Sequence, residues 1–141
     1  MAKRHLAELK IPATPAFIPV AKRVATTLGG QLGLSLMDLD ELSIALTQAC
    51  DSAIGAAADL GTPADLKLTY FATTRALVVD VDLIPTGDAL SLPVAKQDSQ
   101  IDPELQRLAY EMIRCFVDDF RPVIEPRTGH VSFRMVKHLA G

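Results

Sequence analysis

One stretch near the middle of the chain limits the folds that the rest can adopt. Residues 42–58 read LSIALTQACDSAIGAAA, and their apolar members recur at intervals of three and four. This spacing predicts a helix with one broad apolar stripe, which several other elements must cover. We therefore expect this helix to lie at the centre of the core. The stripe consists of Leu42, Ala45, Leu46, Ala49, Cys50, Ala53 and Ile54.

The length and composition of the chain are those of one domain. It has 141 residues, 49% of them hydrophobic, which is enough for a single domain with a substantial core over residues 1–141. Its 14 basic and 17 acidic residues give a net charge of -3, which disfavours nucleic-acid binding through a general positive field. No apolar run approaches the length of a membrane-spanning helix, about 18 residues, and the basic first residues are not followed by the apolar segment of a signal peptide. We expect a cytoplasmic protein that binds neither membranes nor nucleic acid directly.

The cysteines and histidines do not form a metal-binding pattern. Cys50 and Cys115 lack a C-x-x-C partner, and both fall on apolar helical stripes, so we predict two buried thiols in a reducing cytoplasm. His5, His130 and His138 have no acid or cysteine at ligand spacing. We expect no metal site built from these residues.

Helix and strand signals alternate along the chain. Alternating apolar and polar residues predict strands over 5–11, 66–72, 76–83, 123–125 and 131–136, and helical spacing predicts helices over 15–28, 35–58 and 103–121, with a long irregular loop over 84–100. Thr14 should cap the first helix, and Gly29-Gly30 should fray or end it. Ser35 and Asp38 form a capping-box pattern for the second, and Pro122 should close the third. This order predicts an α/β (α+β) two-layer sandwich, with three helices on one face of a mixed, mostly antiparallel sheet.

The late helix carries the clearest amphipathic stripe, which we expect to face the core. Its members are Leu105, Leu108, Ala109, Met112, Ile113, Phe116 and Val117. Charged residues form two groups, and we expect both to be solvated surface, with the rim of a protein-binding surface as the alternative for either. The basic group is Arg121, Arg127, Arg134, Lys137 and His138, and the acidic group is Asp38, Asp40 and Glu41.

The segment A-L-T-Q-A-C-D-S-A-I, residues 45–54, resembles the signature helix of the anti-sigma regulatory factor kinases. These serine-protein kinases are small members of the GHKL superfamily of histidine-kinase-type ATPases, and their helix reads roughly A-V-x-E-A-x-x-N-A. In the family the glutamate activates a water or hydroxyl group, and the asparagine holds the magnesium ion of bound ATP. Gln48 and Ser52 stand at these positions, so the resemblance makes Gln48 a degenerate general-base position and Ser52 a degenerate magnesium-ligand position.

The resemblance extends in order over nearly the whole chain. K-I-P-A-T-P-A-F-I-P-V-A-K-R is similar to the first strand and helix of the family, and L-G-L-S-L-M-D-L-D-E-L is similar to the approach to the signature helix. L-Q-R-L-A-Y-E-M-I-R-C-F-V-D-D-F is similar to a later helix, and G-H-V-S-F-R-M-V-K is similar to the closing strand. V-V-D-V-D is similar to the strand with the adenine-reading aspartate, which implies an adenine contact for Asp82. The resemblance also implies the two-layer fold.

Four site positions depart from the family pattern. Gln48 cannot act as a general base near neutral pH, and Ser52 is a weaker magnesium ligand than asparagine. Asp51 is turned about 100° around the helix from Ser52, so it is no simple substitute. Ile84 stands where a glycine would let the backbone approach the base. Residues 102–104, Asp-Pro-Glu, stand where a glycine-rich segment would hold phosphate at a helix N-terminus.

These departures favour a degenerate family member, a pseudokinase that binds proteins without phosphotransfer and without a resident cofactor. The resemblance then implies an anti-sigma-factor-like regulator of transcription that sequesters a sigma factor, is relieved by an anti-anti-sigma protein with a STAS domain, and forms a homodimer. The alternative is an active ATP-dependent serine/threonine-protein kinase acting on that anti-anti-sigma protein, with Gln48, Ser52 and Asp82 around ATP and magnesium. Plainer interpretations stay open: a structural module of the same fold, a polar patch at Gln48 and Ser52 without a ligand, and an Asp82 that ends a strand at a solvated edge.

Overall fold

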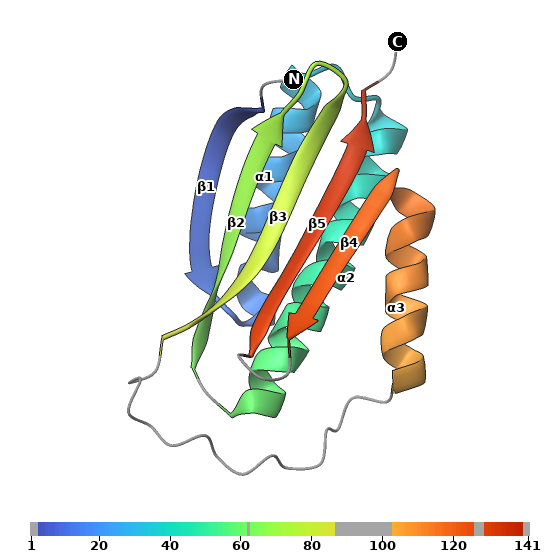
Figure 1. Cartoon of the computed structure of the whole chain (residues 1–141). Coiled ribbons are helices and arrows are strands. Elements are labelled where there is room, and N and C mark those ends of the chain that lie inside the picture. Colours follow the sequence, from blue (N-terminus) through green and yellow to red (C-terminus); the bar gives the residue numbers. More distant parts are fainter. Residues whose placement is uncertain (1–2, 62, 87–102, 126–128, 140–141) are drawn as a thin grey trace.

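The computed structural model describes residues 3–61, 63–86, 103–125 and 129–139, and it arranges them in two layers (Figure 1). Five strands in this part of the chain form one open sheet in the order β1-β2-β3-β5-β4, and three helices cover one of its faces. The elements are β1 (Arg4–Pro12), α1 (Ile18–Gln31), α2 (Leu36–Leu60), β2 (Ala64–Ala72), β3 (Ala76–Pro85), α3 (Pro103–Phe116), β4 (Asp119–Glu125) and β5 (His130–His138).

The predicted fold class, a two-layer sandwich with helices on one face, is confirmed. Each of the four neighbouring strand pairs is antiparallel, so the sheet is not mixed within the described residues. β3 continues to Pro85, into the first residues of the predicted loop, and most of that loop, 87–100, lies outside the described residues. Between β4 and β5, Gly129 is described, and its positive φ of 70° suits a turn.

The stripe of α2 forms the centre of the core, as predicted. Six of its members have no exposed surface, namely Leu42, Ala45, Leu46, Ala49, Cys50 and Ala53, and Ile54 is partly buried against them. α2 packs on the sheet and has α1 on one flank and α3 on the other. The predicted cap is present, because the Ser35 hydroxyl accepts a hydrogen bond of 3.1 Å from the Asp38 backbone N–H. Gly61 ends the helix with a left-handed backbone at φ 67°.

The predicted start of the first helix is confirmed in part, and its predicted end was wrong. Thr14 stands at the N-cap position of a 3₁₀ turn over Pro15–Phe17 that leads directly into α1, but its side chain makes no capping hydrogen bond. The glycine pair does not end the helix, which continues through Gly29 and Gly30 to Gln31. Gly29 is buried, and a Cβ atom there would lie 2.7 Å from Leu39 Cδ2 and 2.8 Å from Leu34 Cδ1. A glycine is therefore required at this position by packing, not by a turn.

The predicted end of the late helix was also wrong. α3 ends at Phe116, and Pro122 lies within β4, opposite Phe133 of β5. β4 is an edge strand in the described sheet, so one of its sides has no neighbouring strand. Proline lacks a backbone N–H, and on that side no neighbouring strand needs one as a donor. Pro122 thus limits pairing at this edge.

A buried lysine joins the two charged groups that we expected to be solvated. The Lys137 side chain on β5 is only 7% exposed, and its Nζ donates to Glu41 Oε2 at 2.7 Å and to the Phe116 carbonyl oxygen at 2.8 Å. Asp38 Oδ1 lies 3.7 Å from the same nitrogen. A buried ammonium group needs such partners, because its desolvation is costly. Lys137 therefore connects the sheet, the first turns of α2 and the end of α3.

We predict that Glu41→Ala destabilises the protein more than Lys137→Met does. The first change leaves a buried ammonium group with weaker partners, which should lower the free energy of unfolding by about 2 kcal/mol. The second removes the charge, and the Asp38 and Glu41 side chains, 29% and 31% exposed, regain water. Urea unfolding of both variants measures the difference. Asp119→Ala, which breaks the exposed pair with Arg121, is the control and should change stability by less than about 0.5 kcal/mol. A larger loss of stability from Lys137→Met than from Glu41→Ala would contradict this role for the lysine.

Candidate functional site

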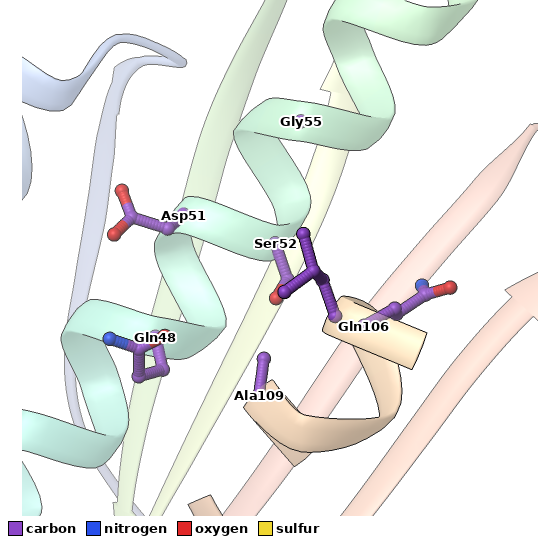
Figure 2. A pocket seen from close by; sticks show the side chains of 7 residues that line it. Gln48, Asp51, Ser52, Gly55, Gln106 and Ala109 are labelled. Carbon is purple, nitrogen blue, oxygen red and sulfur yellow. The ribbon is translucent and has the colours of Figure 1, made fainter. Parts of the chain in front are cut away.

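The two motif residues of the signature segment line one pocket between α2 and α3. Gln48 and Ser52 contribute to a cavity of about 240 Å³ that opens to solvent (Figure 2). Its other lining residues are Asp51, Gly55, Leu105, Gln106 and Ala109. The helical period explains the α2 side, because residues three, four and seven positions apart share one helix face. Gln48 and Ser52 thus lie on one face of α2, four residues apart.

The polar groups of this pocket do not converge on one point. Ser52 points toward α3, whereas Asp51 projects from α2 in a direction away from α3 (Figure 2). The Gln106 side chain points away from α2, and its Nε2 donates to the Tyr110 hydroxyl at 2.9 Å (Figure 2). A reacting phosphate needs donors and metal ligands aimed at one position. The pocket presents separate amide, hydroxyl and carboxylate groups around an apolar wall.

Asp51 is a lining residue that our sequence interpretation set aside. We considered only its one-residue step from Ser52, but it lies three positions from Gln48, and that spacing is the signal that places it in the pocket. Desolvation by its surroundings raises the pKa of the Asp51 carboxyl above its ordinary value, although the residue as a whole is exposed. The charged carboxylate therefore lacks compensating partners strong enough to offset its desolvation.

Asp82 lies on the other side of the sheet from Gln48 and Ser52. Its neighbours Val81 and Leu83 are buried in the core beneath the helices, so the alternation of a strand turns Asp82 to the open face. On that face Asp80 accepts hydrogen bonds from Arg134 Nε at 2.7 Å and from a terminal nitrogen at 2.8 Å. Asp82 pairs in register with Lys67 and Ser132. The three residues that the resemblance assigns to one site therefore do not meet.

The two cysteines have different environments. Cys50 is fully buried as predicted, and desolvation raises the pKa of its thiol to about 12. Cys115 is exposed, so the prediction of two buried thiols was wrong for it. It follows Met112 by three positions and Leu108 by seven, on a flank of α3 that the sheet does not cover.

Part of the apolar stripe predicted for α3 also faces solvent. Ile113 and Val117 are buried, but Leu105 is 64% exposed, Leu108 59% and Met112 44%. α3 packs chiefly against α2 at the edge of the molecule, so only a narrow strip of its surface is covered. On α2, Ile44 is 42% exposed, one turn before Gln48. Apolar side chains therefore flank the pocket.

Comparison with known proteins adds no assignment. No protein-family model matches the sequence, and a search of curated proteins finds no significant match. Within the described ranges, no group of three His, Cys, Asp or Glu side chains is arranged to hold a metal ion. The helices of that same part include none that is both long and apolar enough to cross a membrane.

We predict that Asp51→Asn makes the protein more stable at pH 7. Because the pKa of Asp51 is raised in the folded protein, the native state binds the proton more tightly than the unfolded chain does. The wild type therefore loses stability as the pH rises from the unfolded pKa through the folded pKa, and the amide variant does not. Thermal unfolding from pH 3 to pH 7 should show nearly equal stability at low pH and an advantage for the variant at neutral pH. A variant less stable than the wild type at pH 7 would contradict this sign.

Proposed function

We propose that the chain is a cytoplasmic, anti-sigma-factor-like regulator that acts by binding proteins and not by phosphotransfer. Its partners would be a sigma factor and an anti-anti-sigma protein with a STAS domain, and it would act as a homodimer. The two-layer fold and the position of Gln48 and Ser52 on one exposed helix face agree with the resemblance of the sequence to the anti-sigma regulatory factor kinases.

The separation of the site residues is the observation that carries this proposal. Phosphotransfer requires a base, a metal ligand and a nucleotide contact around one substrate. Gln48 is a neutral amide, Ser52 offers only a hydroxyl, and Asp82 lies across the sheet from both. A protein-binding role needs no such convergence.

The charge and size of the pocket support the same proposal. α2 carries five acidic residues and no basic one, so its field disfavours the phosphates of a nucleotide. The cavity of about 240 Å³ is below the range of roughly 300 to 1,000 Å³ that is typical of small-molecule sites. We therefore propose that ATP and magnesium are not resident cofactors.

An active serine kinase is the second candidate, and one observation favours it. Asp51 places a carboxylate on the rim of the pocket beside Gln48 and Ser52, and its raised pKa brings it closer to the range of a general base. For this activity the carboxylate would have to turn toward α3, and ATP would have to bind.

We predict that millimolar Mg-ATP does not raise the unfolding temperature of the purified protein. A ligand at about a hundredfold above its Kd would add roughly 2.7 kcal/mol, which is readily measured in a domain of this size. Differential scanning calorimetry with Mg-ATP, with magnesium alone and without either tests this. A clear increase that either Asp82→Ala or Asp51→Asn abolishes would support the kinase instead.

We predict that tagged protein from the native host co-purifies with a sigma factor or a STAS-domain protein without added nucleotide. Mass spectrometry of the eluate against that of an unrelated tagged protein identifies the partner. Recovery of neither class from cells in several growth states would overturn the proposed function and leave a structural module of this fold.

A further inference from the structure

An exposed apolar surface surrounds the pocket, and no described element covers it. Leu105, Leu108 and Met112 project from one flank of α3, since they are three and seven residues apart. On α2, Ile44 precedes Gln48 by four residues and Asp51 by seven, so these three side chains lie along one face of the helix, its outer ridge. We call these six residues the α2–α3 surface. Single exposed apolar residues are ordinary, but a contiguous set marks an interaction site.

The two ridges run side by side over their whole length. Leu105, near the start of α3, lines the pocket with Ser52 and Gly55 on α2. The end of α3 meets the start of α2, because Lys137 contacts both the Phe116 carbonyl and Glu41. The helices are therefore antiparallel, and Met112 falls two turns from Leu105, at the level of Ile44.

The dimensions of this surface match a helical partner. From Ile44 to Gly55 the ridge of α2 is about 16 Å long, at 1.5 Å per residue. An amphipathic helix of three turns presents apolar side chains over this length, at positions i, i+3, i+4 and i+7. The exposed residues of α3 offer a complementary row.

The charges along the two ridges are acidic. α2 has no basic residue, and Asp40 and Asp51 on it are exposed. On α3 the exposed Glu111 lies beside Leu108 and Met112. Arg107 and Arg114, seven positions apart, lie on the other flank, where Arg114 stacks over the Phe120 ring at 5.4 Å. Apolar contacts bordered by carboxylates favour a partner with an apolar stripe between basic side chains.

We propose that the α2–α3 surface docks a cationic amphipathic helix of a protein partner, with a lysine or arginine of that helix paired to Asp51. The inference deepens the proposed binding function and rests on it. The aliphatic stem of such a side chain would cross the outer face of α2 beside Gln48, and its charged end would reach the Asp51 carboxylate, which projects away from α3 (Figure 2). An adjacent cation also favours the charged form of Asp51, which desolvation disfavours in the free protein.

The test uses a fluorescein-labelled peptide of about 18 residues, designed as an amphipathic helix with a leucine stripe flanked by lysines. Fluorescence anisotropy should show saturable binding that weakens as salt increases. Leu108→Ser should weaken binding about tenfold, the usual effect of losing an apolar anchor, and Asp51→Asn should weaken it less and reduce its salt dependence. Both residues are exposed, so these variants should fold normally, which their urea midpoints verify.

Two controls make the result specific. A peptide with glutamate in place of each lysine should not bind. Val123→Ser, which changes another exposed apolar residue, on β4, should not affect affinity. Equal binding of the acidic peptide, or an equal loss with Val123→Ser, overturns the proposal. If Leu108→Ser instead turns a dimer into a monomer in analytical ultracentrifugation, a second copy of the chain covers this surface, and the proposal is wrong.

The same variants separate this inference from the proposed function. If the wild type retains a sigma factor or STAS-domain protein, but Leu108→Ser retains it equally well, the docking surface is wrong and the function stands. If the peptide binds as expected and neither protein class is recovered from the host, the proposed partners are wrong and the docking surface stands.

Discussion

Burial of α2 against the sheet is the interaction on which the rest of the structure depends. This 25-residue helix has six stripe residues with no exposed surface, and such a stripe requires neighbours on three sides. The sheet supplies one side, and α1 and α3, from distant parts of the sequence, supply the flanks. Lys137 on β5 joins the start of α2 to the end of α3, through its contacts with Glu41 and the Phe116 carbonyl oxygen. What remains accessible on α2 is a single outer ridge.

The composition of that ridge determines which functions the helix can serve. It presents an amide, a hydroxyl and a carboxylate among apolar side chains, and the Asp51 carboxylate projects away from α3 whereas Ser52 points toward it (Figure 2). The sheet separates these groups from Asp82, because alternate residues of β3 face opposite sides. Acidic charge along α2 disfavours nucleotide phosphates and favours a basic partner. This combination supports our proposal of a protein-binding surface in place of a catalytic centre.

Local signals in the sequence were enough to predict the layers and the centre of the core. Helical spacing identified the α2 stripe, and the Ser35 cap is a contact within one turn. Contacts between distant segments were not predictable in this way: Lys137 and Glu41 are 96 positions apart, and Gly29 is needed only because Leu34 and Leu39 pack on it. Periodicity identified the apolar stripe of α3 but not how much of it a neighbour covers, so Leu105, Leu108 and Cys115 were wrongly predicted as buried.

The central claim is that the Gln48 and Ser52 face of α2 binds protein and not nucleotide. Titration of ¹⁵N-labelled protein with Mg-ATP, followed by two-dimensional NMR, tests it most directly because every backbone amide reports separately. We expect the amide signals of Gln48, Asp51 and Ser52 to stay in place up to millimolar Mg-ATP. Saturable shifts at these residues, together with transfer of phosphate to a STAS-domain protein, would contradict the claim.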